Sequence, residues 1–184
     1  MFDLLSQFEL PILDFIQSIF KNSFFDVFFP ILCFLVNHGE LWILVAIVLL
    51  FIKKYRKDGL ALSIALLMHL IIVNLLIKPL FARVRPYDIN EGVELLVEKL
   101  LDASFPSGHT SVCFAATVVL WHFNKKVGIL SLVYSLLVAF GRLYLYVHFP
   151  SDVIFGAIFG IIFGFASLYI TNYIYKKDFL KKIW

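Results

Sequence analysis

Residues 60–80 read LALSIALLMHLIIVNLLIKPL, and residues 153–175 read VIFGAIFGIIFGFASLYITNYIY. A helix of about 20 apolar residues spans the hydrocarbon core of a bilayer, and both stretches approach that length, as does Val127–Val147. Three shorter apolar segments are expected to extend into their flanks: Phe24–Val36, Leu41–Ile52 and Thr110–Phe123. The pattern predicts an all-α, polytopic membrane protein with six transmembrane helices.

The composition agrees with a lipid environment. Of the 184 residues, 61% are hydrophobic and 16% are charged, and the mean hydropathy is +0.92. A water-soluble core of this size cannot contain 21 Phe residues, so the composition excludes a soluble globular protein. The length fits a single domain over residues 1–184. Cys33 and Cys113 both lie in apolar stretches and are interpreted as buried free thiols.

The N-terminal segment, residues 1–22, has a different pattern. Its apolar residues recur at helical spacing, with acids and amides between them: Leu5, Phe8, Ile12, Phe15, Ile16 and Ile19. This pattern predicts an amphipathic helix over residues 2–20 that lies in the membrane interface rather than crossing it. We expect no cleavable signal peptide, because the segment lacks a basic start followed by an uninterrupted apolar stretch.

The basic residues indicate an orientation for six crossings. With both termini in the cytoplasm, the inner segments 1–23, 53–58, 124–126 and 176–184 carry eleven of the 16 Lys and Arg residues. Cytoplasmic loops are enriched in Lys and Arg, so the arrangement fits the positive-inside rule. The loop over residues 82–108 then lies outside. The expected location is the inner (plasma) membrane, with the functional face toward the periplasm or the outside.

Charged side chains near a membrane core usually mark functional sites. Lys78 lies near the end of the 60–80 stretch, Arg85 follows two helical turns later, and Asn74 lies one turn before Lys78. If the helix persists past Pro79, these side chains form one polar stripe. The alternative is snorkelling, in which the long side chains reach the interface without a partner.

A second group begins the fourth apolar stretch with the sequence Phe105-Pro106-Ser107-Gly108-His109. A helix that starts here leaves backbone N–H groups unpaired, and such an end binds anions, phosphate especially. Ser107 adds a hydroxyl, and His109 in the first turn faces the same place. An ordinary N-cap by Ser107 is an alternative that is compatible with a phosphate site.

A third group lies between the last two apolar stretches and comprises Gly141-Arg142, His148 and Asp152. Asp152 either caps the last helix or accepts a hydrogen bond from Nδ1–H of His148, which would leave Nε2 unprotonated and nucleophilic. All three groups fall on the outer side. Together they supply three cations, two imidazoles, a helix-end amide site and a carboxylate, a set that suits phosphoryl transfer.

The order and spacing of these groups resemble the type 2 phosphatidic acid phosphatase superfamily. Its three motifs are matched by Lys78…Arg85-Pro86, by Pro106-Ser107-Gly108-His109 and by Arg142…His148…Asp152. Gly141 stands where the family usually has Ser, and a backbone amide is the expected replacement for that hydroxyl. Arg83 is an additional basic residue beside the first motif, without an assigned role.

The resemblance implies a lipid phosphate phosphatase that uses no metal or other cofactor. It implies that His148 attacks phosphorus and forms a phosphohistidine, that Asp152 orients the His148 ring, and that His109 protonates the leaving oxygen. It also implies that the phosphate oxygens are held by Lys78, Arg85, Ser107, Gly108 and Arg142. Relatives in this superfamily act on lipid phosphates, polyprenyl diphosphates and lipid A, and the soluble vanadium haloperoxidases fit this apolar chain poorly.

The substrate class stays open at this point. Candidates are undecaprenyl diphosphate, phosphatidylglycerophosphate and the 1-phosphate of lipid A, with the lipid bilayer as the other expected partner and no nucleic acid. The alternative function is a non-catalytic protein that binds or transports lipid phosphates. A transporter would need polar residues along several spans, whereas most of the span interiors are nearly uncharged.

The remaining polar residues have simpler interpretations. His69 and His122 are expected to pack in the protein or lie at the interface. His38 and Glu40 share the outer side with the site and are candidates for a substrate contact. Acidic residues at three- and four-residue spacing predict a short amphipathic interfacial helix near the site: Glu91, Glu94 and Glu98.

Overall fold

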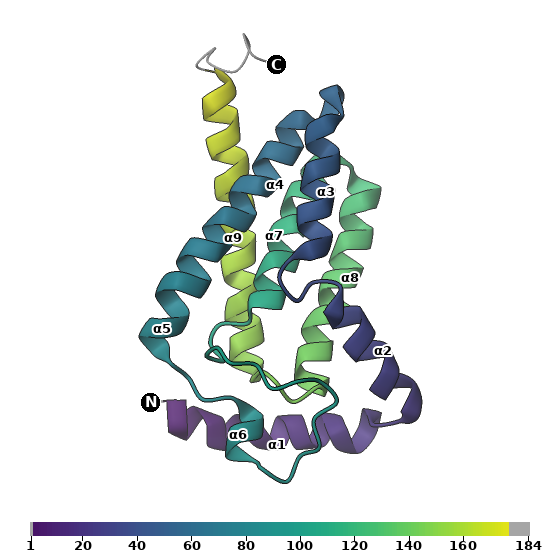
Figure 1. Ribbon diagram of the computed structural model, residues 1–184, viewed down its shortest axis with the longest axis vertical. Coiled ribbons are helices and arrows are strands. Elements are labelled where there is room, and N and C mark those ends of the chain that lie inside the picture. The colour runs from purple at the N-terminus through teal and green to yellow at the C-terminus, as the bar shows by residue number, and fades with distance from the viewer. Residues whose placement is uncertain (1, 177–184) are drawn as a thin grey trace.

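The computed structural model describes residues 2–176, and every regular element in that range is helical. Helix α1 (Phe2–Phe20) lies across one end of a helical bundle, called here the lower end as drawn in Figure 1. The other elements follow in this order: α2 (Ser23–Phe34), α3 (Glu40–Phe51), η1 (Lys53–Tyr55), α4 (Arg56–Met68), η2 (His69–Ile77), α5 (Lys78–Phe81), α6 (Pro86–Ile89), α7 (Gly108–Phe123), α8 (Lys125–Tyr144) and α9 (Pro150–Lys176). By length and composition, three helical stretches within the described residues can cross a membrane: Lys53–Ile89, Lys125–Tyr144 and Pro150–Lys176.

Helices α2 and α3 form a single path from the lower end of the bundle to the upper end (Figure 1). The ring of Phe25 in α2 packs against Tyr144 at the lower end of α8, with centroids 6.1 Å apart. Farther along α2, the Leu32 carbonyl accepts a hydrogen bond from Tyr134 at 2.9 Å. Tyr134 lies in the middle of α8, so α2 ends near mid-depth.

Helix α3 starts at that depth and continues upward. Trp42, near its beginning, packs against the same Tyr134, with centroids 5.7 Å apart. Near its end, the Leu50 carbonyl accepts a hydrogen bond from Nε of Arg56 at the upper end, at 3.1 Å. Within the described residues the bundle therefore has five passes, α2–α3, α4–α5, α7, α8 and α9, and the prediction of six crossings is not confirmed. The reason is length, because a helix of 12 residues rises only about 18 Å, roughly half of a bilayer.

Helix α1 lies at the same end as the loop over residues 82–107. The hydroxyl of Tyr146 donates to Oδ1 of Asp14 at 2.7 Å, and the Gln17 side chain donates to the Tyr144 carbonyl. The prediction that residues 1–23 lie on the side opposite this loop is therefore wrong, and Lys21 leaves the count of basic residues at the upper end. The described cations that remain there are Lys53, Lys54, Arg56, Lys57, Lys125, Lys126 and Lys176. Lys177, Lys181 and Lys182 lie outside the described residues.

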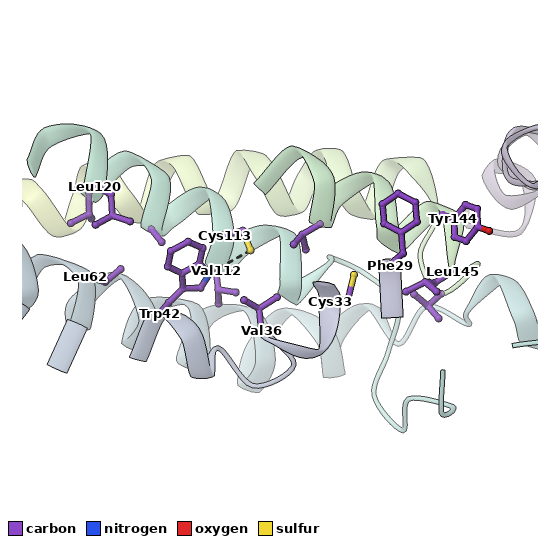
Figure 2. Close-up of a cluster of buried hydrophobic side chains, with 14 of the residues drawn as sticks. Phe29, Cys33, Val36, Trp42, Leu62, Val112, Cys113, Leu120, Tyr144 and Leu145 are labelled. Atoms are coloured by element: carbon purple, nitrogen blue, oxygen red, sulfur yellow. Dashed lines mark hydrogen bonds between the residues drawn. The ribbon is translucent and has the colours of Figure 1, made fainter. Parts of the chain in front are cut away.

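Helix α7 is packed directly against α9 and α8. Gly156, Gly160 and Gly164 recur every fourth residue along α9 and allow this approach, since a Cβ at Gly160 would lie only 2.3 Å from the Ser111 carbonyl oxygen. On the other side of α7, a buried apolar cluster includes Trp42, whose Nε1 donates to Sγ of Cys113 at 3.4 Å (Figure 2). Cys33 and Cys113 are both free and buried, which confirms their interpretation.

The loop between α6 and α7 is irregular. Residues 90–107 contain turns and bends and no helix, so the predicted helix around Glu91 and Glu98 is wrong. The apolar residues of this segment lie within five positions rather than at the spacing of a helical turn, and they pack onto the core: Val93, Leu95, Leu96 and Val97. The loop is thereby held across the lower end of the bundle.

Candidate active site

A cavity of about 730 Å³ lies between α3, α4, η2 and α7 and reaches the lower loops. Five of the residues singled out in the sequence line it: Lys78, Arg85, Gly108, His109 and His148. The wall of the cavity farther from the loops is apolar and comes mainly from α3 and α4: Val36, Ile43, Leu66, Leu67 and Leu70. The cavity therefore has a charged end near the loops and an apolar end between α3 and α4.

Two cations at the charged end are held by one carboxylate. Asp102 of the irregular loop pairs with Nζ of Lys78 and, through Oδ1, with Nη2 of Arg85 at 2.7 Å. Burial acts to raise the pKa of the Asp102 carboxyl, but the charges and hydrogen bonds of Lys78 and Arg85 outweigh it and lower this pKa to about 2. Lys78 and Arg85 are both nearly fully buried, which excludes simple snorkelling for them.

Arg142, in the last turn of α8, is the third cation. Its side chain is buried, and its Nε and Nη2 have no hydrogen-bond partner among the described residues. Buried donors are almost always paired, so two unpaired donors beside other cations indicate a place for an anion. Its neighbour Gly141 faces away from the cavity. A Cβ there would lie 2.9 Å from the Phe29 ring and 3.1 Å from Sγ of Cys33, which explains why Ser is absent at this position.

The start of α7 offers two open backbone donors. Ser107 is the N-cap, and its Oγ accepts hydrogen bonds from the amide of Thr110 at 3.4 Å and from its hydroxyl at 2.9 Å. The Ser107 amide donates to the Asp152 carbonyl at 2.9 Å. The next two amides, those of Gly108 and His109, lie in the first turn of α7 and have no carbonyl acceptor within the helix. The cap and an anion site therefore coexist, since the Ser107 hydroxyl hydrogen and two amides stay available.

His109 points into the cavity. Its Nε2 lies 3.0 Å from Oδ1 of Asn37, in the turn between α2 and α3. An amide oxygen can only accept, so Nε2 carries the proton in this contact. His109 thus presents an acidic N–H toward the part of the cavity that leads to the apolar wall.

His148 lies in the connection between α8 and α9, and only 1% of its surface is exposed. Its Nε2 lies 3.4 Å from Nη1 of Arg85, and because a guanidinium only donates, Nε2 is the unprotonated nitrogen. Burial, followed by the positive charges of Arg85, Arg142 and Lys78, holds the pKa of His148 well below its usual range. A neutral imidazole with a free Nε2 lone pair is the form required of a nucleophile.

Asp152 is fully buried in the first turn of α9. Its Oδ2 lies 3.6 Å from Nδ1 of His148, too far for a direct hydrogen bond, and accepts from the Phe149 amide at 2.9 Å. Ser104 lies between the two side chains, donating to Oδ2 of Asp152 at 2.5 Å with its Oγ 3.5 Å from Nδ1 of His148. The first alternative for Asp152 is therefore present, because its carboxylate accepts from the backbone at the start of α9. The direct hydrogen bond to His148 is absent, and the Ser104 hydroxyl lies between the two side chains.

Several residues of this arrangement were not singled out in the sequence. Asp102 and Ser104 lie in the loop that precedes Pro106, and their proximity to that motif is the signal that could have identified them. Arg83, which had no assigned role, forms an ion pair with Oδ1 of Asp152 at 2.5 Å. His69 lines the cavity, although it was interpreted as a packing residue. By contrast, His122 pairs with Asp58 at 3.1 Å, and neither lines the cavity.

The fold and these side chains define a class of protein, an α-helical membrane protein with a buried histidine and cation site. Comparison with known proteins agrees. The PAP2 superfamily profile matches residues 58–176. The chain is 34% identical over 145 residues to the undecaprenyl-diphosphatase of Sulfolobus acidocaldarius, an alignment that covers 77% of this chain and 70% of that protein.

Two solved structures share the fold. LpxE of Aquifex aeolicus superposes with a TM-score of 0.76 at 31% identity, covering 88% of this chain and 94% of LpxE. A PAP2-type phosphatidylglycerolphosphate phosphatase from Bacillus subtilis superposes with a TM-score of 0.73 at 23% identity, covering 93% of this chain and 88% of that one. The chain belongs to the PAP2 superfamily and is a membrane lipid phosphatase, which confirms the resemblance found in its motifs.

Proposed function

We propose that this phosphatase hydrolyses the diphosphate of a polyprenyl lipid, undecaprenyl diphosphate being the first candidate, through a phosphohistidine. The observation that carries the proposal is the single cavity that joins Lys78, Arg85 and His148 to an apolar wall formed by Leu66 and Leu70. The undecaprenyl-diphosphatase among its relatives supports the choice of lipid. Phosphatidylglycerophosphate and the 1-phosphate of lipid A remain the competing substrates.

In the proposed reaction, the terminal phosphate lies between Lys78, Arg85 and Arg142, with further donors from Ser107 and the Gly108 amide. Nε2 of His148 attacks phosphorus in line, and the bond from phosphorus to the bridging oxygen breaks. His109 gives its Nε2 proton to that oxygen, exchanging Asn37 for the leaving group. Water then cleaves the phosphohistidine with His109 as the base, which releases phosphate and regenerates His148.

A diphosphate also needs donors for its second, lipid-linked phosphate, and two side chains of η2 are suitably placed. A Cβ at Gly108 would lie 3.7 Å from Nε2 of His69 and 3.9 Å from Oδ1 of Asn74, so both side chains border the start of α7. In a π-helix the hydrogen bonds run from i to i+5, so residues five apart, such as His69 and Asn74, lie nearly above one another. Along the chain, His69 and Asn74 lie between the apolar Leu66 and the cationic Lys78, and all four residues line the cavity.

The membrane placement follows from the same features. The basic upper end would face the cytoplasm and the site would face the outside, so that α1 and the site share the outer side. Helix α1 exposes an apolar row and would lie in the outer interface: Leu4, Leu5, Phe8, Ile12, Phe15 and Ile19. The lipid chain would enter sideways toward the apolar wall.

The direct test is turnover of purified protein in matched detergent, with His148→Ala as the inactive control. The panel contains undecaprenyl diphosphate, phosphatidylglycerophosphate, lipid A 1-phosphate and a water-soluble sugar phosphate. We expect the polyprenyl diphosphate to have the highest kcat/KM and a short-chain diphosphate to fall by orders of magnitude, because each buried CH₂ contributes about 0.8 kcal/mol. Equal turnover of the sugar phosphate would contradict a lipid substrate.

A further inference from the structure

Arg83 holds two carboxylates that come from opposite ends of the described chain. Its Nη1 pairs with Oδ1 of Asp152 and its Nη2 with Oε2 of Glu9, each at 2.5 Å, and its guanidinium lies over the Phe149 ring, 4.0 Å from the centroid. The Arg83 side chain is 1% exposed. A buried guanidinium with its planar fork set between two carboxylates and an aromatic face has little freedom to move.

Glu9 is the less expected member of this group. It belongs to α1, outside residues 58–176 that match the superfamily profile, yet its side chain is only 7% exposed. Its second oxygen, Oε1, accepts a hydrogen bond at 2.6 Å from the Ser151 amide, in the first turn of α9. Glu9 therefore contacts both the guanidinium that binds Asp152 and the backbone next to Asp152.

We propose that Glu9 is a positioning residue for catalysis: through Arg83 it fixes Asp152 beside His148, so that α1 forms part of the active site. This inference rests on the proposed nucleophilic role of His148. When Nε2 of His148 attacks phosphorus, its ring becomes positively charged, and the Asp152 carboxylate stabilises that charge. Glu9 neutralises Arg83, which would otherwise draw on the same carboxylate and add an unbalanced positive charge nearby.

The test compares Glu9→Gln with Asp14→Asn. Both substitutions keep the side-chain shape and remove one negative charge from α1, but Asp14 accepts a hydrogen bond from Tyr146, whereas Glu9 pairs with Arg83. Glu9→Gln is expected to lower kcat by about 10- to 100-fold, with KM changed less than about twofold. Thermal unfolding in detergent shows whether each variant is folded at the assay temperature, and Glu9→Asp, which keeps the charge, is expected to restore most of kcat.

The pH profile separates a charge effect from a loss of docking. The charged or titratable groups near His148 are Lys78, Arg83, Arg85, Asp102, His109, Arg142 and Asp152. Removing the negative charge of Glu9 disfavours the protonated imidazole further, so the acid limb of kcat should move to lower pH in Glu9→Gln and stay in place in Asp14→Asn. If Glu9→Gln is not folded, Glu9→Asp must keep the wild-type acid limb and show the smaller loss of kcat that its shorter side chain causes.

Three results would overturn the inference: unchanged kcat in Glu9→Gln, an equal loss in Asp14→Asn, or a lower kcat without a shift of the acid limb. None of these touches the proposed function. That proposal fails on its own if His148→Ala retains activity.

Discussion

Substitution of His69 by Phe should separate diphosphates from monophosphates. Nδ1 of His69 lies 3.1 Å from Oγ of Ser111. In the tautomer in which the hydroxyl donates to Nδ1, His69 keeps an Nε2–H that can donate to a ligand in the cavity. A hydrogen bond to a charged group contributes about 1.5–3 kcal/mol, which corresponds to a factor of about 10 to 150 in kcat/KM. The loss should appear only with a substrate that carries the second phosphate. The Ser111 hydroxyl can turn to the carbonyl one helical turn before it, so the fold should tolerate the change.

The assay uses one polyprenyl chain in two forms, as diphosphate and as monophosphate, in the same detergent. His69→Phe should lower kcat/KM for the diphosphate by the stated factor and leave the monophosphate within about twofold. His122→Phe is the matched control, because His122 is half-exposed and pairs with Asp58 away from the cavity. Equal losses for both substrates would refute the reasoning, since they would assign His69 to the terminal phosphate or to the fold.

Three further predictions concern the chemistry and the orientation. His148→Ala should abolish both phosphoenzyme and turnover, whereas His109→Ala should lose less activity with a good leaving group, as measured with aryl and alkyl phosphates; equal residual activities would argue against His109 as the acid. Activity should survive EDTA, and vanadate should inhibit by occupying the phosphate site, so a strict requirement for a divalent ion would contradict the mechanism. In intact cells an impermeant thiol reagent should label Ser18→Cys and Glu91→Cys but not Arg56→Cys, and the reverse pattern would invert the orientation.

The sequence was sufficient to predict that these side chains lie together but not the contacts among them. Lys78, Arg85, His109 and His148 meet in one cavity because their spacing places each at a lower helix end or in a lower loop. The role of Arg83 could not be predicted in the same way. Its partners, Glu9 and Asp152, lie 74 and 69 residues away, and no local pattern encodes contacts at such separations.

The number of passes could not be predicted either. In a hydropathy profile, the apolar segments of α2 and α3 are two similar peaks. The profile does not show whether the turn between them reverses the chain direction, which gives two crossings, or only bends the chain, which gives one. Gly39 adopts a left-handed conformation in that turn, with φ of 81°, and α3 continues upward from it. The direction is fixed by tertiary packing, of α2 against α8 and of α3 against α4. One pass fewer then moves α1 to the side of the site, where Glu9 can reach Arg83.

The charges at the lower end also favour the binding of an anion there. Four buried cations lie in or next to the cavity: Lys78, Arg83, Arg85 and Arg142. The carboxylates that pair with them are those of Glu9, Asp102 and Asp152. His148 is neutral in its contact with Arg85, so it does not change the balance. Each of the first three cations has a carboxylate partner, while Arg142 keeps two unpaired donors. An unpaired buried charge is costly, and a bound anion relieves that cost. A phosphate bound beside Arg142 would relieve this cost, so vanadate or inorganic phosphate should raise the unfolding temperature of the wild-type protein more than that of Arg142→Met.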